Sequence, residues 1–162
     1  MSRSSKPRKA YRPRSLINPL TLLRPASPAD RQAIEARFYS ALESMVAGRQ
    51  PGLDEWRDLS DAVNTVETLA GSTGHLNPSE VMPVVQDAIT GMVLASRRYK
   101  AGQGMRLDAA GIAALREVVG IYVQCMERLT EAEMRGAQQA TARRTEQVLR
   151  GQRVDGVEVV TC

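Results

Sequence analysis

The residues of this chain best suited to chemistry are cations at its beginning. Residues 1–14 carry six Lys and Arg and no acid, a net charge of +6, while the other 148 residues hold 16 Lys and Arg against 18 Asp and Glu. Cations in an extended, proline-containing segment neutralise phosphates and release counterions, and an aromatic ring among them stacks on a base. We predict a nucleic-acid-binding arm whose contacts are Arg3, Lys6, Arg8, Lys9, Tyr11, Arg12 and Arg14. An acidic protein surface as the target of the arm, or a solubilising tail, are the two alternatives.

A second group of cations lies near the end of the chain, at Arg143, Arg144, Arg150 and Arg153. The structural interpretation is a solvated helix face, supported by the i, i+4 pairs Glu131–Arg135 and Glu146–Arg150. The functional interpretation is a second phosphate-contacting surface that includes Arg143 and Arg144, or an oligomer seam.

Acids crowd the beginning of one expected helix, at Asp54, Glu55, Asp58 and Asp61. The helix dipole favours anions in this position, so a solvated acidic face is the structural interpretation. As an alternative function, this face is the contact surface of a protein–protein inhibitor or adaptor that mimics nucleic acid.

Candidate catalytic and metal-binding residues are few. His75 is the single histidine, and a zinc site usually takes four ligands. Cys125 lies beside an apolar helical stripe, which favours a small buried side chain over an activated thiolate. The Gly71–Gly74 stretch lacks the Gly-Lys-Ser/Thr of a phosphate loop. We therefore expect no enzyme activity, no metal and no cofactor.

The body that must position these groups has an all-α composition, since good helix formers are abundant and strand-forming residues are sparse. We divide the chain into a flexible basic arm (1–15), a helical bundle (16–150) and a short tail (151–162). Asp155-Gly156 in the tail is a hairpin signal. Two cysteines are too few for a disulfide framework and favour a reducing, cytoplasmic setting.

Apolar residues recurring every three or four positions predict about four main helices. They are expected to begin at Ser27-Pro28, near Asp54, between Glu80 and Pro83, and near Asp108. Short connections predict mostly antiparallel neighbours. The expected core is Phe38, Trp56, Leu59, Val63, Val85, Ile89, Met92, Leu115, Val119, Tyr122 and Met126.

The fourth helix poses a problem of length. Its apolar stripe stops at Leu129, although a helical composition continues to residue 149. A continuous helix over 108–149 would be roughly 60 Å long. We expect that the helix either breaks near Gly136 or projects from the body beyond residue 130.

The run Lys6-Pro7-Arg8-Lys9-Ala10-Tyr11-Arg12-Pro13-Arg14 resembles the beginning of a group of small, mostly uncharacterised proteins from prophages and other mobile elements of proteobacteria. The resemblance covers about nine residues and the general arrangement of a basic run before a helical body. It implies an accessory protein of a phage or mobile element, with inhibition of host defence among its roles, and it implies no catalytic residues.

We expect a non-enzymatic DNA- or RNA-associated factor, with a homodimer through helix four as one arrangement. The alternative is an inhibitor or adaptor of a host protein complex, acting through the acidic face or the projecting part of helix four. No stretch approaches the roughly 20 apolar residues of a membrane span, so we expect a cytoplasmic protein that does not bind membranes.

Overall fold

A computed structural model describes residues 21–47, 52–71 and 73–151 of the chain. The basic arm, the turn at 48–51, Ser72 and the tail at 152–162 lie outside the described residues. The predictions of a flexible arm and of a hairpin at Asp155-Gly156 therefore concern parts of the chain that the structure does not describe.

The described residues form helices and no strand, which confirms the all-α prediction. The part of the chain that the structure describes contains five α-helices where about four were expected, preceded by one short 3-10 helix. In chain order they are η1 (Thr21–Leu23), α1 (Pro28–Ala47), α2 (Leu53–Gly71), α3 (Pro78–Lys100), α4 (Ala109–Arg128) and α5 (Glu131–Leu149).

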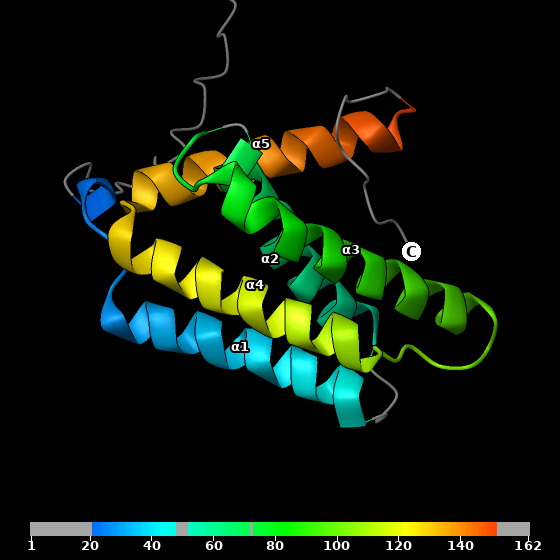
Figure 1. The fold of residues 1–162 in the computed structure, drawn as a ribbon. Helices are drawn as coiled ribbons and strands as arrows, with labels where there is room; N and C mark the ends of the chain where they lie inside the picture. Colours follow the sequence, from blue (N-terminus) through cyan, green and yellow to red (C-terminus); the bar gives the residue numbers. More distant parts are fainter. Residues whose placement is uncertain (1–20, 48–51, 72, 152–162) are drawn as a thin grey trace, which may run out of the picture.

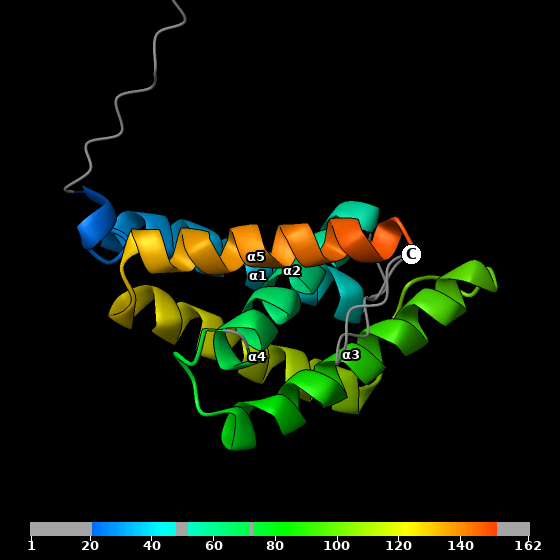
Figure 2. The same ribbon diagram turned by 90° about the horizontal axis from the view of Figure 1, so that it is seen from above.

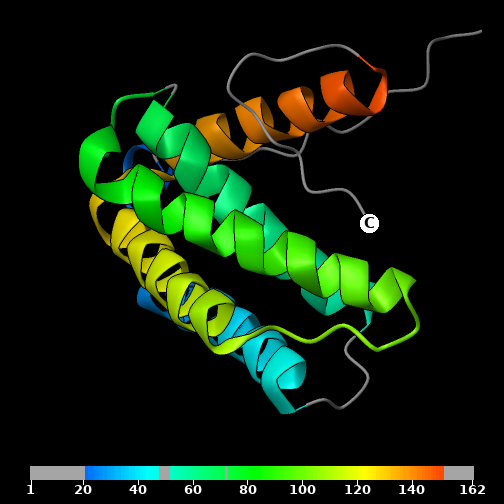
Figure 3. The same cartoon turned by 45° about the vertical axis from the view of Figure 1, so that its right-hand side comes forward.

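The helices surround α2, which contacts α1, α3, α4 and α5. Figure 1 shows α1, α4 and α3 side by side and alternating in direction, with α5 crossing α2 at the top of the view. Figure 3 shows α4 between α1 and α3, and it contacts both. This order places the end of α1, the beginning of α2 and the α3–α4 connection at one end of the molecule, and η1 with the α4–α5 connection at the other (Figure 1).

Side-chain caps fix where several helices begin. Ser27 accepts a hydrogen bond from the backbone N–H of Asp30 (3.2 Å) before α1, and Asp108 accepts one from Gly111 (2.8 Å) before α4. Both starts were predicted from the sequence. The start of α3 was predicted too late: Asn77 caps it, the helix begins at Pro78, and Pro83 lies inside it. The fixed φ of proline suits a helix, and burial of neighbours on this helix offsets the missing hydrogen bond.

The break after α4 also differs from the prediction. Helix α4 ends at Arg128, and Leu129 is extended. Thr130 and Glu133 form a reciprocal capping box that begins α5, so the helix breaks before Thr130 and not near Gly136. Helix α5 buries Met134, Ala137 and Thr141, and Thr141 contacts Thr68 of α2. The expectation of a projecting helix four is therefore wrong.

The predicted core is confirmed, because all eleven of its residues are buried. Two of its aromatic rings, those of Phe38 and Tyr122, meet edge to face, with centroids 5.0 Å apart. Helix α4 contributes several of these residues and is apolar enough, by length and composition alone, to cross a membrane, contrary to the expectation that no stretch comes close. The core helix of a soluble protein passes the same test, and α4 packs here against α1, α2 and α3.

Two glycines let α3 and α4 approach each other closely. A Cβ atom built on Gly91 would lie 2.6 Å from the Cα of Gly111, and one built on Gly111 would lie 3.0 Å from the Cα of Gly91. Both obstacles are backbone atoms, so a side chain at either position requires the helices to separate. This contact sets the distance between the two helices.

We predict that Gly91→Ala lowers the free energy of unfolding by about 1–3 kcal/mol, because the added methyl group overpacks the α3–α4 contact. Urea unfolding followed by circular dichroism measures the change. Gly120→Ala is the matched control: nothing lies within 4 Å of its Cβ position, and alanine in this helix should add about 0.5–1 kcal/mol. Equal effects of the two substitutions would contradict the close approach.

Candidate functional site

The structure separates two cations that the sequence places together as candidate phosphate contacts. Arg143 is exposed on α5. Arg144 turns toward α2, where its side chain is 20% exposed and forms an ion pair with Glu67 (3.1 Å). The arm residues Arg3, Lys6, Arg8, Lys9, Tyr11, Arg12 and Arg14 lie outside the described residues, so the structure does not bring them to any surface.

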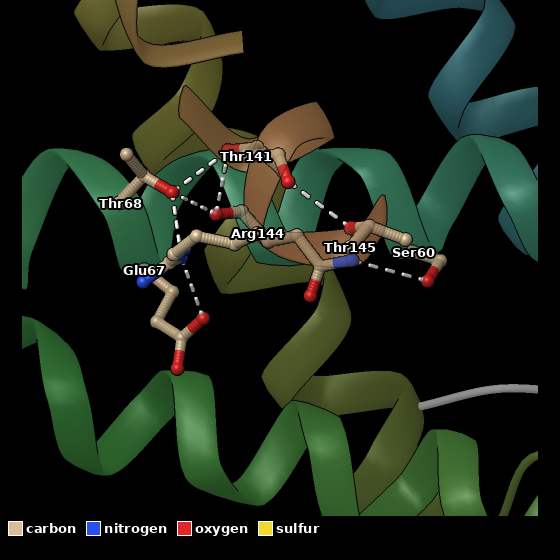
Figure 4. Close-up of polar contacts among 7 residues, drawn as sticks. Ser60, Glu67, Thr68, Thr141, Arg144 and Thr145 are labelled. Carbon is tan, nitrogen blue, oxygen red and sulfur yellow. Dashed lines mark hydrogen bonds and ion pairs between the residues drawn. The ribbon is translucent and has the colours of Figure 1, made fainter. Parts of the chain in front are cut away.

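Arg144 belongs to a group of polar side chains between α2 and α5, which we call the polar lock: Glu67, Thr68, Thr141 and Arg144 (Figure 4). The hydroxyls of Thr68 and Thr141 are 2.7 Å apart, and Arg144 donates to both Glu67 and Thr68. Thr141 also donates to the backbone carbonyl of Asn64. These bonds join helices more than 70 residues apart in the sequence, so Arg144 serves to dock α5.

The charge of Glu67 depends on this docking. Its side chain is 5% exposed, and burial raises the pKa of the carboxyl above its ordinary 4.5, while the charge and hydrogen bond of Arg144 lower it. A buried carboxylate is costly unless it is paired and hydrogen-bonded, so Arg144 makes this charge tolerable inside the fold.

The acidic face of α2 is partly neutralised. Asp54 pairs with Arg57 on its own helix (3.3 Å), and Asp58 pairs with Arg37 of α1 (3.3 Å). For Asp61, burial and the nearby Asp58 raise the pKa of the carboxyl, while Arg37 lowers it. The structure thus brings Asp58 and Asp61 together beside a cation of α1, whereas Glu55 lies half-buried in the first turn.

Asp61 opens onto a groove between α1 and α5, two helices whose Cα atoms nowhere come within 8 Å of each other. Two adjoining cavities, of about 460 Å³ and about 340 Å³, make up this α1–α5 groove. Tyr122 and Gln138 line both, and the Gln138 amide donates to the Tyr122 hydroxyl (2.8 Å) across the floor. Figure 2, which views the molecule from above, shows α5 along the top of the body.

The walls of the groove carry both charges and apolar groups. Arg37 and Glu146 lie at one end, and Asp30 and Arg135 lie at the other. Ile34, Phe38, Met126, Met134 and Leu149 supply apolar surface. The groove therefore offers apolar surface together with charges of both signs.

The sequence-based interpretations of His75 and Cys125 agree with their places in the structure. His75 lies in an exposed loop, and Cys125 is 3% exposed, with burial raising the pKa of its thiol. Within the part of the chain that the structure describes, no group of three or more His, Cys, Asp or Glu is placed to hold a metal ion. The predicted pairs Glu131–Arg135 and Glu146–Arg150 both form along α5.

Sequence reasoning missed Arg37 and Glu67. Glu67 follows Val63 by one turn on the buried side of α2, and a charge inside an apolar stripe is a signal that it needs a distant partner. Nothing local to Arg37 identifies Asp58 as its partner, because the two lie on different helices.

For the polar lock we predict that Arg144→Met lowers the free energy of unfolding at pH 7 by about 3 kcal/mol, since it leaves Glu67 charged and unpaired. The raised pKa of Glu67 means that the folded state binds a proton on this carboxyl more tightly than the unfolded chain does. The loss of folding free energy caused by the Glu67 charge is therefore fully present above the pKa of the folded state, and it fades as the pH falls toward 4.5. The difference from wild type should shrink accordingly, as measured by urea unfolding at several pH values.

Arg150→Met provides the control for this prediction, because it removes an exposed pair with Glu146 and should cost less than about 0.5 kcal/mol at every pH. Adding Glu67→Gln to Arg144→Met should restore most of the lost stability at pH 7. A pH-independent loss, or one equal to that of Arg150→Met, would show that Arg144 does not neutralise Glu67.

Comparisons of the chain with protein-family models, with curated proteins and with solved structures find no match. Its function is therefore inferred from its own residues: a basic arm, a half-neutralised acidic face and the α1–α5 groove beside it.

Proposed function

We propose that this chain is a non-enzymatic binding module, an accessory or regulatory factor of a phage or mobile element whose basic arm engages nucleic acid in the cytoplasm of a bacterial host. The observation that carries the proposal is the distribution of charge. All of the excess positive charge lies in residues 1–14, ahead of a helical body with more acids than cations. The resemblance of this basic run to prophage proteins supports the same assignment.

The helical body supports this division in two ways. Six ion pairs among the described residues engage cations of the body, so part of its positive charge is neutralised within the fold. The arm precedes η1 in the sequence, and η1 packs against α5. The Arg24 carbonyl accepts a hydrogen bond from the Glu131 N–H (2.8 Å) at this junction.

Deletion of residues 1–15 should weaken binding to DNA and RNA by at least about a hundredfold at low salt, because it removes six phosphate-neutralising cations. The dependence of log affinity on log salt should become less steep by roughly 4 to 5 for the same reason. Fluorescence anisotropy with labelled oligonucleotides measures both quantities. The proposal fails if the truncated chain binds as tightly as the full chain.

A charge-preserving control separates an electrostatic role from a specific one. Replacing Arg3, Arg8, Arg12 and Arg14 by Lys keeps the charge of the arm and should leave the salt dependence unchanged. If this variant loses binding as fully as the deletion does, the arm recognises more than the charge of the phosphates.

A second candidate function is that of a protein–protein inhibitor or adaptor, for example of a host defence complex. The α1–α5 groove favours it, because its cavities have a size and a mixed lining, including the exposed Asp61, that suit side chains of a partner. In this proposal the contact surface includes α5 and the acidic beginning of α2. A homodimer would use the same surface.

For this second function we predict that a nuclease-treated pull-down from host lysate recovers a stable protein partner, and that Asp61→Lys lowers the recovery by at least about tenfold. The substitution places a cation next to Arg37 and fills the edge of the groove. Asp87→Lys, an exposed charge reversal on α3, is the matched control and should have no effect. Equal recovery with both variants would remove the groove from the contact.

A further inference from the structure

A third group of cations, in the last turn of α3 and the loop after it, is separate from the arm, the polar lock and the groove. Arg97, Arg98, Lys100 and Arg106 lie within ten residues that contain no acid. Figures 1 and 2 show the end of α3 extending past the beginning of α4, at the end of the molecule opposite η1. We call Arg97–Arg106 the basic tip.

The tip is exposed and held in place at its base. Residues 99–104 are exposed, while Met105 is 1% exposed and Leu107 is buried, so the loop is anchored in the core at its far end. The N–H groups of Gly102 and Gln103 bond to the carbonyls of Tyr99 and Arg98 (both 2.9 Å). Gly102 and Gly104 have φ values of +73° and +80°, which side chains rarely adopt. The tip therefore has a defined backbone.

Of the four cations, Arg98 stabilises the tip, and the other three are exposed to solvent. Arg98 donates to the Arg106 carbonyl (2.7 Å) and pairs with Asp108 (3.4 Å), which braces the loop against α4. Within the described residues no ion pair involves Arg97, Lys100 or Arg106, and all three are exposed. Cations in the last turn of a helix interact favourably with the helix dipole. The dipole does not account for Arg106, because this residue lies beyond the end of α3.

An exposed aromatic residue, Tyr99, stands between Arg98 and Lys100 in the last turn of α3. Tyr99 is 44% exposed, whereas Phe38, Trp56 and Tyr122 are buried. Cations that follow a phosphate backbone, together with an aromatic ring on which a base stacks, are the elements of single-strand binding surfaces. Stacking requires an unpaired base, so this combination favours single-stranded nucleic acid over a duplex.

We propose that the basic tip is a second nucleic-acid-binding surface, which takes a single strand with its phosphates on Arg97, Lys100 and Arg106 and a base on Tyr99. The inference rests on the proposed function for its class of ligand, but it depends on different residues from those of the arm. The sequence signal for it is the run Arg97-Arg98-Tyr99-Lys100 followed by Arg106, a basic cluster with an aromatic residue inside it.

The test uses the full chain and a labelled 20-nucleotide oligo-dT or oligo-U, with anisotropy measured from 50 to 200 mM salt. The variant Arg97→Gln/Lys100→Gln/Arg106→Gln should bind at least about tenfold more weakly at 50 mM salt, and its salt slope should be less steep by roughly 2. Tyr99→Ala should lower the affinity about five- to tenfold and leave the salt slope unchanged, and Tyr99→Phe should bind like wild type.

The control Arg57→Gln/Arg116→Gln/Arg128→Gln removes the same charge from exposed positions outside the tip. Because all the substituted side chains are exposed, thermal unfolding should be unchanged for both triple variants. The inference is overturned if the tip variant binds like wild type, or if the control loses as much affinity as the tip variant. It is also overturned if a duplex of equal length binds as tightly as the single strand and responds equally to Tyr99→Ala.

The arm deletion distinguishes failure of this inference from failure of the proposed function. If the arm deletion weakens binding and the tip variants do not, the proposed function stands and the tip is not a site. If the full chain binds neither oligonucleotide nor duplex, both proposals fail together.

Discussion

The burial of α2 is the constraint on which the rest of the structure depends. Four helices pack around α2, and its buried side includes a carboxylate, Glu67, in addition to apolar residues. A charge in such a place requires a partner that excludes water and supplies the opposite charge. Helix α5 does both through Arg144, so its docking completes the body and is not an optional extension of α4.

The close approach of Gly91 and Gly111 complements this contact on the other side of the body. It brings α3 and α4 together tightly enough that α4 lies between α1 and α3 and still contacts α2. With α5 held on α2 and α3 held on α4, the α1–α5 groove remains open, because the Cα atoms of α1 and α5 stay more than 8 Å apart. The same arrangement carries η1 and the basic tip to opposite ends of the molecule (Figure 1).

Local patterns account for most of what the sequence predicted correctly. The apolar stripes specify which faces of α1 to α4 are buried, and Ser27 and Asp108 mark helix starts through short-range hydrogen bonds. Thr130 and Glu133 were readable in the same way as a capping box, and they would have placed the break before α5 correctly. The pairs Arg144–Glu67 and Arg37–Asp58 join different helices, so periodicity contains no information about them. For this reason the role of Arg144 and the groove could not be derived from the sequence.

Amide chemical-shift mapping of the full chain during titration with a single-stranded oligonucleotide tests most directly whether both the arm and the basic tip bind nucleic acid. The account predicts that shifts change along residues 1–15 and 97–106, while the amides of α2 and those lining the α1–α5 groove stay unchanged. Perturbations confined to the groove, with the arm and the tip unaffected, would contradict it.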